Sequence, residues 1–510
     1  MKKYIVLIIS IFAVYTTYAQ TPLDALRYSQ NQYGGTARSV AMGSSFSALG
    51  ADLSTLATNP AGIALYRGGE FSFTPAILND QVKSSFNGSS NSDFKYGFLF
   101  NNLGFAVTFD DNNSTSGWKG VSFGISYNRL QNYNQNIVIE GVNNVGSMID
   151  LFAYNANAQD PSGAYDPLND FYEAGAYETF LIDYADGEYW SPVKDNGVYG
   201  QTQRKFINRK GGLGEYDFTF GANYEDKLYI GGTMGIQSLH YKENTVYKES
   251  NIPFSSDTVY VTNPESSSSY IIESPDFFTL NEDLITSGTG INLKLGIIYR
   301  PIDWLRVGAA FHTPTFFSLT DRYKTEFYAK YLNKLPTGEY DREWPPIENR
   351  EYSSFSYELV TPSRFIGSLG VIIRKVALLS VEYEYVNYTR AKFSAYEDDF
   401  SSTNQDIQNS FIAASNIRAG GELKLGPASL RAGFGYYANP YSSELNRLNA
   451  SQIVVSGGVG LTSGSFYVDF AYNQSMYEDN YFLYNGYVNE PVPALSLKRG
   501  TGMVTFGVKF

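Results

Sequence analysis

The sequence predicts an all-β fold, a transmembrane antiparallel up-and-down β-barrel of about 14 strands with an N-terminal, mostly helical hatch inside its lumen. Three observations predict it. Apolar and polar residues alternate along most of the chain after Phe71, and the connections between these segments are short and long by turns. After the first twenty residues no apolar run reaches the roughly eighteen residues that a helical membrane span needs.

Composition agrees with this fold class. The 510 residues include 43 Tyr, 35 Phe and 47 Gly but no Cys. Without disulfides, an exported chain must be stabilised by burial or by a membrane. The formal net charge of −13 argues against a nucleic-acid partner, because nucleic acid selects basic surfaces.

The N-terminus has the pattern of a secretory signal peptide. Lys2 and Lys3 form its charged region, residues 5–14 are apolar, and Ala19 is a small residue suited to cleavage before Gln20. We therefore expect three regions: a signal peptide at 1–19, a hatch at 20–68 and a barrel at 69–510.

The alternation is clearest in the stretch SGSFYVDFAYN. Its Phe466, Phe470 and Tyr472 share one face, while Asp469 and Asn473 lie on the other. The same pattern recurs at residues 291–300, 305–312 and 378–388. One face is apolar and the other carries small, polar or charged residues, as expected of strands with lipid outside and a lumen inside. A β-sandwich would show the same alternation.

Connection lengths distinguish the barrel from a sandwich or a propeller. Short connections lie near Glu225 and at 300–303, 374–376, 426–428 and 462–465. Long, polar connections lie at about 142–211, 248–285, 329–350, 396–411, 440–450 and 486–495. An outer-membrane barrel produces this alternation, with tight turns at its periplasmic end and extended loops at its outer end. We expect a monomer whose outer face contacts outer-membrane lipid.

The C-terminus supports the same fold. TGMVTFGVKF alternates Val504, Phe506 and Val508 and ends on Phe510. An aromatic residue that ends an amphipathic last strand resembles the signal recognised by outer-membrane barrel-assembly machinery. We therefore expect that machinery as a partner through Phe510.

The segment before the first strand has helical rather than alternating spacing. Asn59 is suited to cap, and Pro60 to begin, a short helix that runs through Ala64. Residues 24–68 are rich in Gly, Ala and Ser, whose small side chains let the backbone approach a surrounding wall. A compact helical piece ahead of a closed barrel is expected to lie inside it.

This segment resembles a known hatch. Residues 33–66, YGGTARSVAMGSSFSALGADLSTLATNPAGIALY, look like the N-terminal hatch of FadL/TodX-type outer-membrane transporters for long-chain fatty acids and hydrocarbons. The similarity rests on a motif and on a run of small residues: Asn59, Pro60, Ala61 and Gly62, and Gly34, Gly35, Arg38 and Gly43. Residues 299–315 are similar to a barrel hairpin of that family that ends in a Thr-Pro pair.

The resemblance implies a function and a place. It leads us to expect a barrel in the outer membrane of a Gram-negative bacterium that imports hydrophobic small molecules by hatch-gated facilitated diffusion. The implied route ends sideways, through the barrel wall and into the bilayer. The alternative is a structural or interaction barrel whose loops bind a partner protein, in a secretion complex or in surface adhesion. A water-filled porin is disfavoured because the hatch would block it.

Two groups of residues are candidate sites. Aromatic residues within 148–190 have roughly helical recurrence and either line an apolar ligand-capture groove or pack as a lid over the barrel mouth: Phe152, Tyr154, Phe171, Tyr172, Tyr177 and Phe180. Four lumen arginines either bind a ligand carboxylate or anchor the hatch: Arg306, Arg364, Arg418 and Arg431. As anchors they would act through Glu382, Glu384, Glu422 and similar partners.

The sequence predicts no enzyme, metal or cofactor. The two histidines, His240 and His312, fall on separate strands with no nucleophile–base spacing nearby. The stretch DDNNSTSG begins like a calcium loop but lacks the glycine and glutamate that an EF-hand requires.

Overall fold

The computed structural model describes residues 20–110, 116–191, 193, 197–253, 259–262, 269–272, 275–334, 340–344, 351–374, 376–396, 398–443, 450–484 and 492–510. The predicted signal peptide lies outside these residues, as do most of the turn at 110–117 and part of each long loop.

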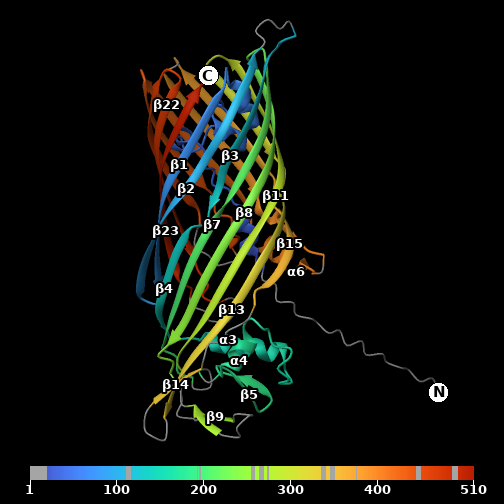
Figure 1. Cartoon of the computed structure of the whole chain (residues 1–510), viewed down its shortest axis with the longest axis vertical. Helices are drawn as coiled ribbons and strands as arrows, with labels where there is room; N and C mark the ends of the chain where they lie inside the picture. The colour runs from blue at the N-terminus through green and yellow to red at the C-terminus, as the bar shows by residue number, and fades with distance from the viewer. Residues whose placement is uncertain are drawn as a thin grey trace, which may run out of the picture.

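The described strands form a closed antiparallel barrel of fourteen strands, which confirms the predicted fold class (Figure 1). Four of the fourteen consist of two segments. In order round the barrel they are β1 (Glu70–Phe86), β2 (Ser89–Asp110), β3 (Trp118–Asn132) with β4 (Gln135–Asn143), β7 (Gln201–Tyr224), β8 (Leu228–Ser250), β11 (Pro275–Ile302), β12 (Leu305–His312) with β13 (Phe316–Lys334), β15 (Ser353–Val360) with β16 (Arg364–Ile373), β17 (Ala377–Asn387) with β18 (Lys392–Ser394), β19 (Ala413–Leu425), β20 (Ala428–Tyr437), β21 (Gln452–Ser463), β22 (Phe466–Asn480) and β23 (Ala494–Lys509).

The barrel closes between its first and last strands. β23 pairs with β1 from Glu70 opposite Lys509 to Ser85 opposite Ala494. Gly69 and Phe510 exchange backbone hydrogen bonds at this closure, at the end that carries the short turns. Closure removes the free strand edges that a sheet of this size would otherwise expose.

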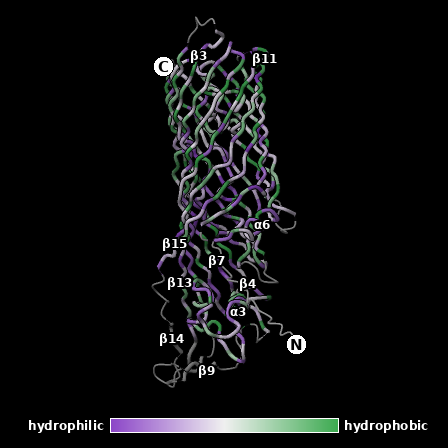
Figure 2. The backbone as a smooth tube through the Cα atoms, turned by 90° about the vertical axis from the view of Figure 1, so that its right-hand side faces the viewer, coloured by the Kyte–Doolittle hydropathy of each residue, from purple (hydrophilic) through white to green (hydrophobic). Residues whose placement is uncertain are grey.

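Apolar residues concentrate in the part of the barrel next to the short turns (Figure 2), and exposed apolar side chains on its strands form a band there. On β11, Ile291, Leu293 and Leu295 are 54%, 54% and 64% exposed, while the intervening Asn292 and Lys294 are buried. The strands therefore turn apolar side chains outward and polar ones inward, the arrangement of a barrel in lipid.

One side of the barrel projects well past this band. β11 is 28 residues long, whereas about ten residues cross a bilayer. Together with β7, β8 and β13 it forms a sheet that extends toward the long-loop end (Figure 1).

The predicted loop bounds are wrong along this projecting sheet, where residues 201–211, 275–285 and 329–334 are strand. The reason is visible in β7, whose inward residues there are Gln201, Gln203 and Lys205. With polar residues on both faces, the stretch lacks the apolar stripe by which a strand is recognised in a sequence.

The hatch consists of four short helical segments: α1 (Pro22–Ser29), α2 (Ala37–Ala41) and the 3₁₀ turns η1 (Leu53–Ala57) and η2 (Pro60–Leu65). α2 contacts β20 to β23, η1 contacts β2, β3, β7 and β8, and η2 contacts β3, β7, β8 and β11. Contacts on opposite arcs of the cylinder place the hatch within the lumen. None of the described helices combines the length and the apolar character needed to cross a membrane.

Helices α3 (Met148–Gln159) and α4 (Glu173–Glu178) close the long-loop end, where the inner face of the projecting sheet packs against them (Figure 1). The remaining described elements are β5 (Asp183–Ala185), β6 (Glu188–Trp190), β9 (Val259–Thr262), β10 (Ser269–Ile272), β14 (Tyr340–Trp344), η3 (Tyr388–Arg390) and α6 (Ser401–Ser410).

Candidate functional site

The Asn-Pro-Ala motif is a buried turn that touches the barrel wall. Asn59 is the N-cap of η2, and its Oδ1 accepts a hydrogen bond from the Ala61 N–H at 3.2 Å. Its Nδ2 donates to the Ser47 carbonyl at 2.9 Å and to the Ile297 carbonyl of β11 at 3.3 Å. One side chain therefore joins two parts of the hatch to the wall.

Wall glycines make room for this turn. A Cβ on Gly296 would lie 2.0 Å from Asn59 Oδ1, and a Cβ on Gly231 would lie 2.4 Å from the Pro60 carbonyl oxygen. Neither distance is compatible with a side chain, so the lumen-facing glycines of β8 and β11 are part of the site. The sequence carried a signal for them, since they interrupt otherwise regular strands at inward positions.

Hatch glycines serve the same close packing. Gly62 donates its N–H to the Asn59 carbonyl, and a Cβ there would lie 2.5 Å from Thr55 Oγ1. Gly43 has a positive φ of 66°, and a Cβ on it would lie 2.7 Å from the Phe434 carbonyl oxygen. Gly34 donates its N–H to the Arg129 carbonyl, and Gly35 also has a positive φ, of 102°.

Ion pairs connect the hatch to the wall on the β19–β22 side. Arg38 of α2 binds Glu422 through two hydrogen bonds of 2.8 and 2.9 Å. Arg431 also binds Glu422 and, through its other nitrogen, Asp469, each at 2.6 Å. The structure thus joins Arg38, predicted as a hatch residue, to Arg431 and Glu422, predicted as lumen charges.

A second group lies on β16, β17 and β19. Arg418 binds both Glu382 and Glu384, and Arg364 binds Glu384 at 2.9 Å. The group also reaches the hatch, because Glu382 accepts a hydrogen bond from the Ser47 N–H and Arg364 donates to the Ser29 carbonyl. Arg306, the remaining predicted charge, donates to the carbonyl of Leu49. All seven predicted lumen charges thus contact the hatch or a residue that does.

A third ionic group escaped sequence reasoning. Lys294 binds Glu215 and Asp217 of β7, and all three side chains are buried. Nearby, His312 forms a 2.7 Å hydrogen bond with the Thr58 carbonyl of the hatch. The sequence did contain a sign of this group, because Glu215 and Asp217 alternate with the outward-facing Tyr216 and Phe218 and must therefore point into the lumen.

A cavity of about 330 Å³ lies beside α1, between the hatch and the wall. We call it the α1 chamber. Its lining is amphipathic: apolar groups come from Leu26, Ile137 and Leu497, and guanidinium groups from Arg27, Arg209 and Arg499. Each guanidinium has a carboxylate partner: Asp24 for Arg27, Glu243 for Arg209 and Asp80 for Arg499. The volume falls in the range of small-molecule sites.

The wall is interrupted next to this chamber, where β3 ends at Asn132 and β4 begins at Gln135. β2 pairs with β3 only from Asn102 to Asp110, and β4 pairs with β7. In the described residues no backbone ladder joins β2 to β4. Gln131, Asn132, Tyr133 and Gln135, at the interruption, line the chamber.

Side chains replace the missing ladder. Ser84 donates to the Val138 carbonyl, Asn87 to the Val142 carbonyl at 2.8 Å and Asn91 to the Glu140 carbonyl at 3.2 Å. We call this line between the β1–β2 hairpin and β4 the seam. Side-chain hydrogen bonds of this kind can be broken one at a time, whereas a strand ladder opens cooperatively.

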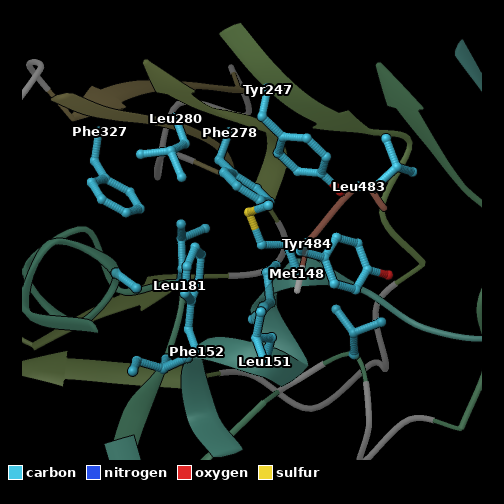
Figure 3. Close-up of a cluster of buried hydrophobic side chains, with 14 of the residues drawn as sticks. Met148, Leu151, Phe152, Leu181, Tyr247, Phe278, Leu280, Phe327, Leu483 and Tyr484 are labelled. Carbon is cyan, nitrogen blue, oxygen red and sulfur yellow. The ribbon is translucent and has the colours of Figure 1, made fainter. Parts of the chain in front are cut away.

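Most of the predicted capture residues pack against the inside of the long-loop end, and we call the region 147–191 the lid. Phe152 is buried and forms ring contacts with Phe278 and Phe327, at 6.4 and 5.7 Å between centroids, in the cluster that Figure 3 shows. The Tyr172 hydroxyl donates to Glu282 on β11 at 2.9 Å, and Phe171 packs on Tyr323. These contacts join the region to β11 and β13 of the wall.

The other predicted lid residues differ in exposure. Tyr177 forms a tilted ring contact with Tyr165 and an edge-to-face contact with Tyr189, and Phe180 is half-buried against the same cluster. Tyr154, at 63% exposure, faces away from the cluster. Glu249 of β8 fixes the lid to the wall, since it accepts hydrogen bonds from Ser147 and from the Met148 N–H at the start of α3.

Lid packing is expected to weaken as the pH rises. Burial raises the pKa of the Glu173 carboxyl in α4 and of Asp183 in β5. A carboxyl whose pKa is raised by folding contributes stability that is complete below its ordinary pKa and is lost as the pH rises through the raised value. Proteolysis within 147–191 should therefore be faster near pH 8 than near pH 5.

The variant Glu173→Gln checks this expectation. Asn155 and Gln159 donate to different oxygens of the Glu173 carboxylate, so the amide oxygen of glutamine can keep one of these two hydrogen bonds, and the side chain carries no charge at any pH. The pH dependence of cleavage should become flatter. An unchanged pH profile in this variant would show that the Glu173 carboxyl does not cause the pH dependence.

Comparison with known proteins places the fold. No family model and no curated protein matches the chain. Among solved structures, a Pseudomonas aeruginosa FadL homologue aligns at 12% identity and a TM-score of 0.53 over 94% of this chain and 100% of its own. The Pseudomonas putida toluene transporter TodX aligns at 12% identity and 0.50, over 94% and 100%.

The fold is that of the FadL-type channels. At these identities the likeness concerns architecture alone. The chain is a multi-pass β-barrel of the kind that spans the outer membrane of Gram-negative bacteria. The apolar band of its own outer face gives the physical reason, because only lipid matches such a surface round a complete cylinder.

Proposed function

We propose that this protein is an outer-membrane transporter that imports hydrophobic small molecules, such as long-chain fatty acids or hydrocarbons, by hatch-gated facilitated diffusion. The observation that carries the proposal is the position of the α1 chamber. It lies between the hatch and the wall and is lined by residues at the β3–β4 interruption, where the ladder to β2 stops. The seam therefore separates a molecule near this chamber from the outer surface of the wall.

The chemistry of the chamber suits an amphiphile. Each buried methylene contributes about 0.8 kcal/mol, so apolar walls such as Leu26 and Leu497 attract a hydrocarbon tail. Arg27, Arg209 and Arg499 offer hydrogen bonds to a polar end. Because these guanidiniums are already paired, a ligand head group competes with carboxylates, which favours moderate affinity and allows release.

A ligand in the chamber would contact the hatch directly through α1. Leu26 and Arg27 of α1 line it, and Tyr28 of the same helix packs against Tyr133 and Tyr241 of the wall. A ligand that binds better when α1 is displaced would shift the hatch toward that position.

Uptake by cells is the direct test. Cells that carry the gene should accumulate a radiolabelled long-chain fatty acid, or toluene in a parallel assay, several-fold faster than cells that lack it. A matched hydrophilic solute should enter both at the same rate. The proposal would be refuted if cells with and without the gene took up each apolar probe at the same rate.

The seam is expected to limit passage of the apolar molecule through the wall. The triple variant Ser84→Ala, Asn87→Ala, Asn91→Ala loses three hydrogen bonds to β4 carbonyls, each contributing about 0.5–1.5 kcal/mol. We expect faster uptake of the apolar probe than in the native protein. Asn208→Ala is the control, because Asn208 bonds to Asn136 where β4 and β7 keep their ladder. Equal rates in the triple variant and the control would exclude passage through the seam.

The filled mouth favours a second candidate, a barrel whose loops bind a partner protein. The cluster around Phe152 and Phe278 fills the inside of the long-loop end with packed side chains (Figure 3). Cross-linking on intact cells separates the two functions. A stoichiometric protein partner joined to the 148–190 region, together with unchanged uptake, would favour the second.

A further inference from the structure

Cationic side chains form a row across the outer face of the projecting sheet. The strand register places Lys210 of β7 opposite Lys242 of β8, Lys242 opposite Ile285 of β11, and Ile285 opposite Arg322 of β13. Lys324 follows on β13, two residues farther from the apolar band. We call Lys210, Lys242, Arg322 and Lys324 the cationic row.

The row lies on the same face as the apolar band and beyond its edge. The last apolar cross-strand row consists of Tyr216, Ile236, Ile291 and Phe316. Two rows of small or polar residues follow: Gly214, Ser238, Thr289 and Ser318, then Gly212, His240, Ser287 and Thr320. Six residues at about 3.3 Å each, on strands tilted by about 40°, place the cationic row roughly 15 Å above the band.

Sheet stability does not explain this arrangement, because like charges directly opposite each other destabilise a strand pair. Lys210 nevertheless faces Lys242 in a chain whose net charge is −13. Within the described residues, neither Lys210 nor Arg322 has a carboxylate at ion-pair distance; Arg322 instead lies over the Tyr352 ring at 4.7 Å.

The acidic residues on this face leave an excess of positive charge. Asp283 pairs with Lys242 at 3.2 Å and Glu326 with Lys324 at 2.7 Å. Glu358 lies closer to the band, opposite Ser318, and accepts a hydrogen bond from Ser394. None of these three stands opposite Lys210 or Arg322.

We propose that the cationic row binds the phosphate groups of a phosphorylated glycolipid in the outer leaflet. Charge and depth support this occupant. The head-group layer of a bilayer leaflet is only about 5–8 Å thick, so a phospholipid phosphate lies below the row, whereas a phosphate borne on a sugar reaches it. The acyl chains of the same lipid would lie on the exposed Ile291 and Leu293 directly beneath. This binding does not depend on transport.

Lipid binding by the full-length barrel tests the proposal. The variant Lys210→Gln, Lys242→Gln, Arg322→Gln, Lys324→Gln is compared with a control that loses four cations at the short-turn end: Arg67→Gln, Lys227→Gln, Arg374→Gln, Lys424→Gln. The probes are purified lipopolysaccharide and the same material after enzymatic dephosphorylation. We expect the first variant to bind phosphorylated lipopolysaccharide at least tenfold more weakly, and the control to bind it like the native protein.

Two further measurements separate charge from folding and lipid from free anion. The variant Lys210→Arg, Lys242→Arg, Lys324→Arg keeps the charge and should keep the affinity. Inorganic phosphate at millimolar concentration should not displace the lipid. Equal affinity in the Gln variant, equal affinity for dephosphorylated lipid, or displacement by phosphate alone would each overturn the proposal.

Discussion

Replacing Asn59 by alanine is expected to abolish uptake of an apolar probe while the barrel still assembles. The change removes two donor hydrogen bonds, to the Ser47 and Ile297 carbonyls, and the cap on the Ala61 N–H. Because Asn59 is fully buried, each group left unpaired costs about 1–3 kcal/mol. The turn then loses its attachment to β11, and the hatch no longer holds the arrangement that transport requires.

The variant Asn59→Asp refines this expectation. Its carboxylate can still cap the Ala61 N–H but cannot donate to Ser47 or Ile297, so uptake should fall nearly as far as in the alanine variant. Thr58→Ser is the neighbouring control, because it keeps the backbone contact with His312. Native uptake in Asn59→Ala, with folded barrel at the cell surface, would show that the motif has no part in transport.

Replacing Arg418 by methionine is expected to give the largest loss of stability. Arg418 is fully buried, binds Glu382 and Glu384, and lies over the Tyr33 ring of the hatch at 4.8 Å. Removing one partner from a buried ionic group leaves an uncompensated charge, which costs about 3–5 kcal/mol. The temperature at which the folded barrel converts to the unfolded form on a gel should fall clearly.

Two controls test the cause. The double variant Arg418→Met, Glu382→Gln removes charges of both signs and should recover part of the loss. Arg204→Met removes an exposed partner of Glu140, 56% accessible, and should cost no more than about 1 kcal/mol. If the Arg418 and Arg204 variants unfolded at the same temperature, the buried ionic group would not be stabilising the hatch–wall contact.

The faces of the strands were predictable because alternation is a local property. Leu293 and Leu295 lie outward, and Glu382 and Glu384 inward, as their parity requires. The cap at Asn59 was equally predictable, since Pro60 restricts the residue before it and supplies the first position of the turn. Both inferences depend on neighbours within a few residues of each other.

The projecting sheet and the lid were less predictable. At 275–285 the inner face of the strand packs against α3 and α4, and Phe278 and Leu280 are buried there. The pattern of a membrane strand, with apolar residues outward and polar residues inward, therefore does not apply to this stretch. The sequence pattern of the aromatic residues near Phe152 and Phe171 is compatible with either a ligand groove or a packed lid. Only the packing of Phe152 against Phe278 and Phe327 distinguishes the two.

By itself the sequence determined which side chains point to lipid and which to the lumen, that the strands close into a cylinder, and that a helical segment precedes them. The tertiary structure decided which inward charges meet, as with Arg38 and Glu422, which lie 384 residues apart. It also decided where the ladder between β2 and β4 stops and which cations align outside. The physical reason is that a period of two specifies a face, whereas a neighbour depends on strand register and on closure of the whole barrel.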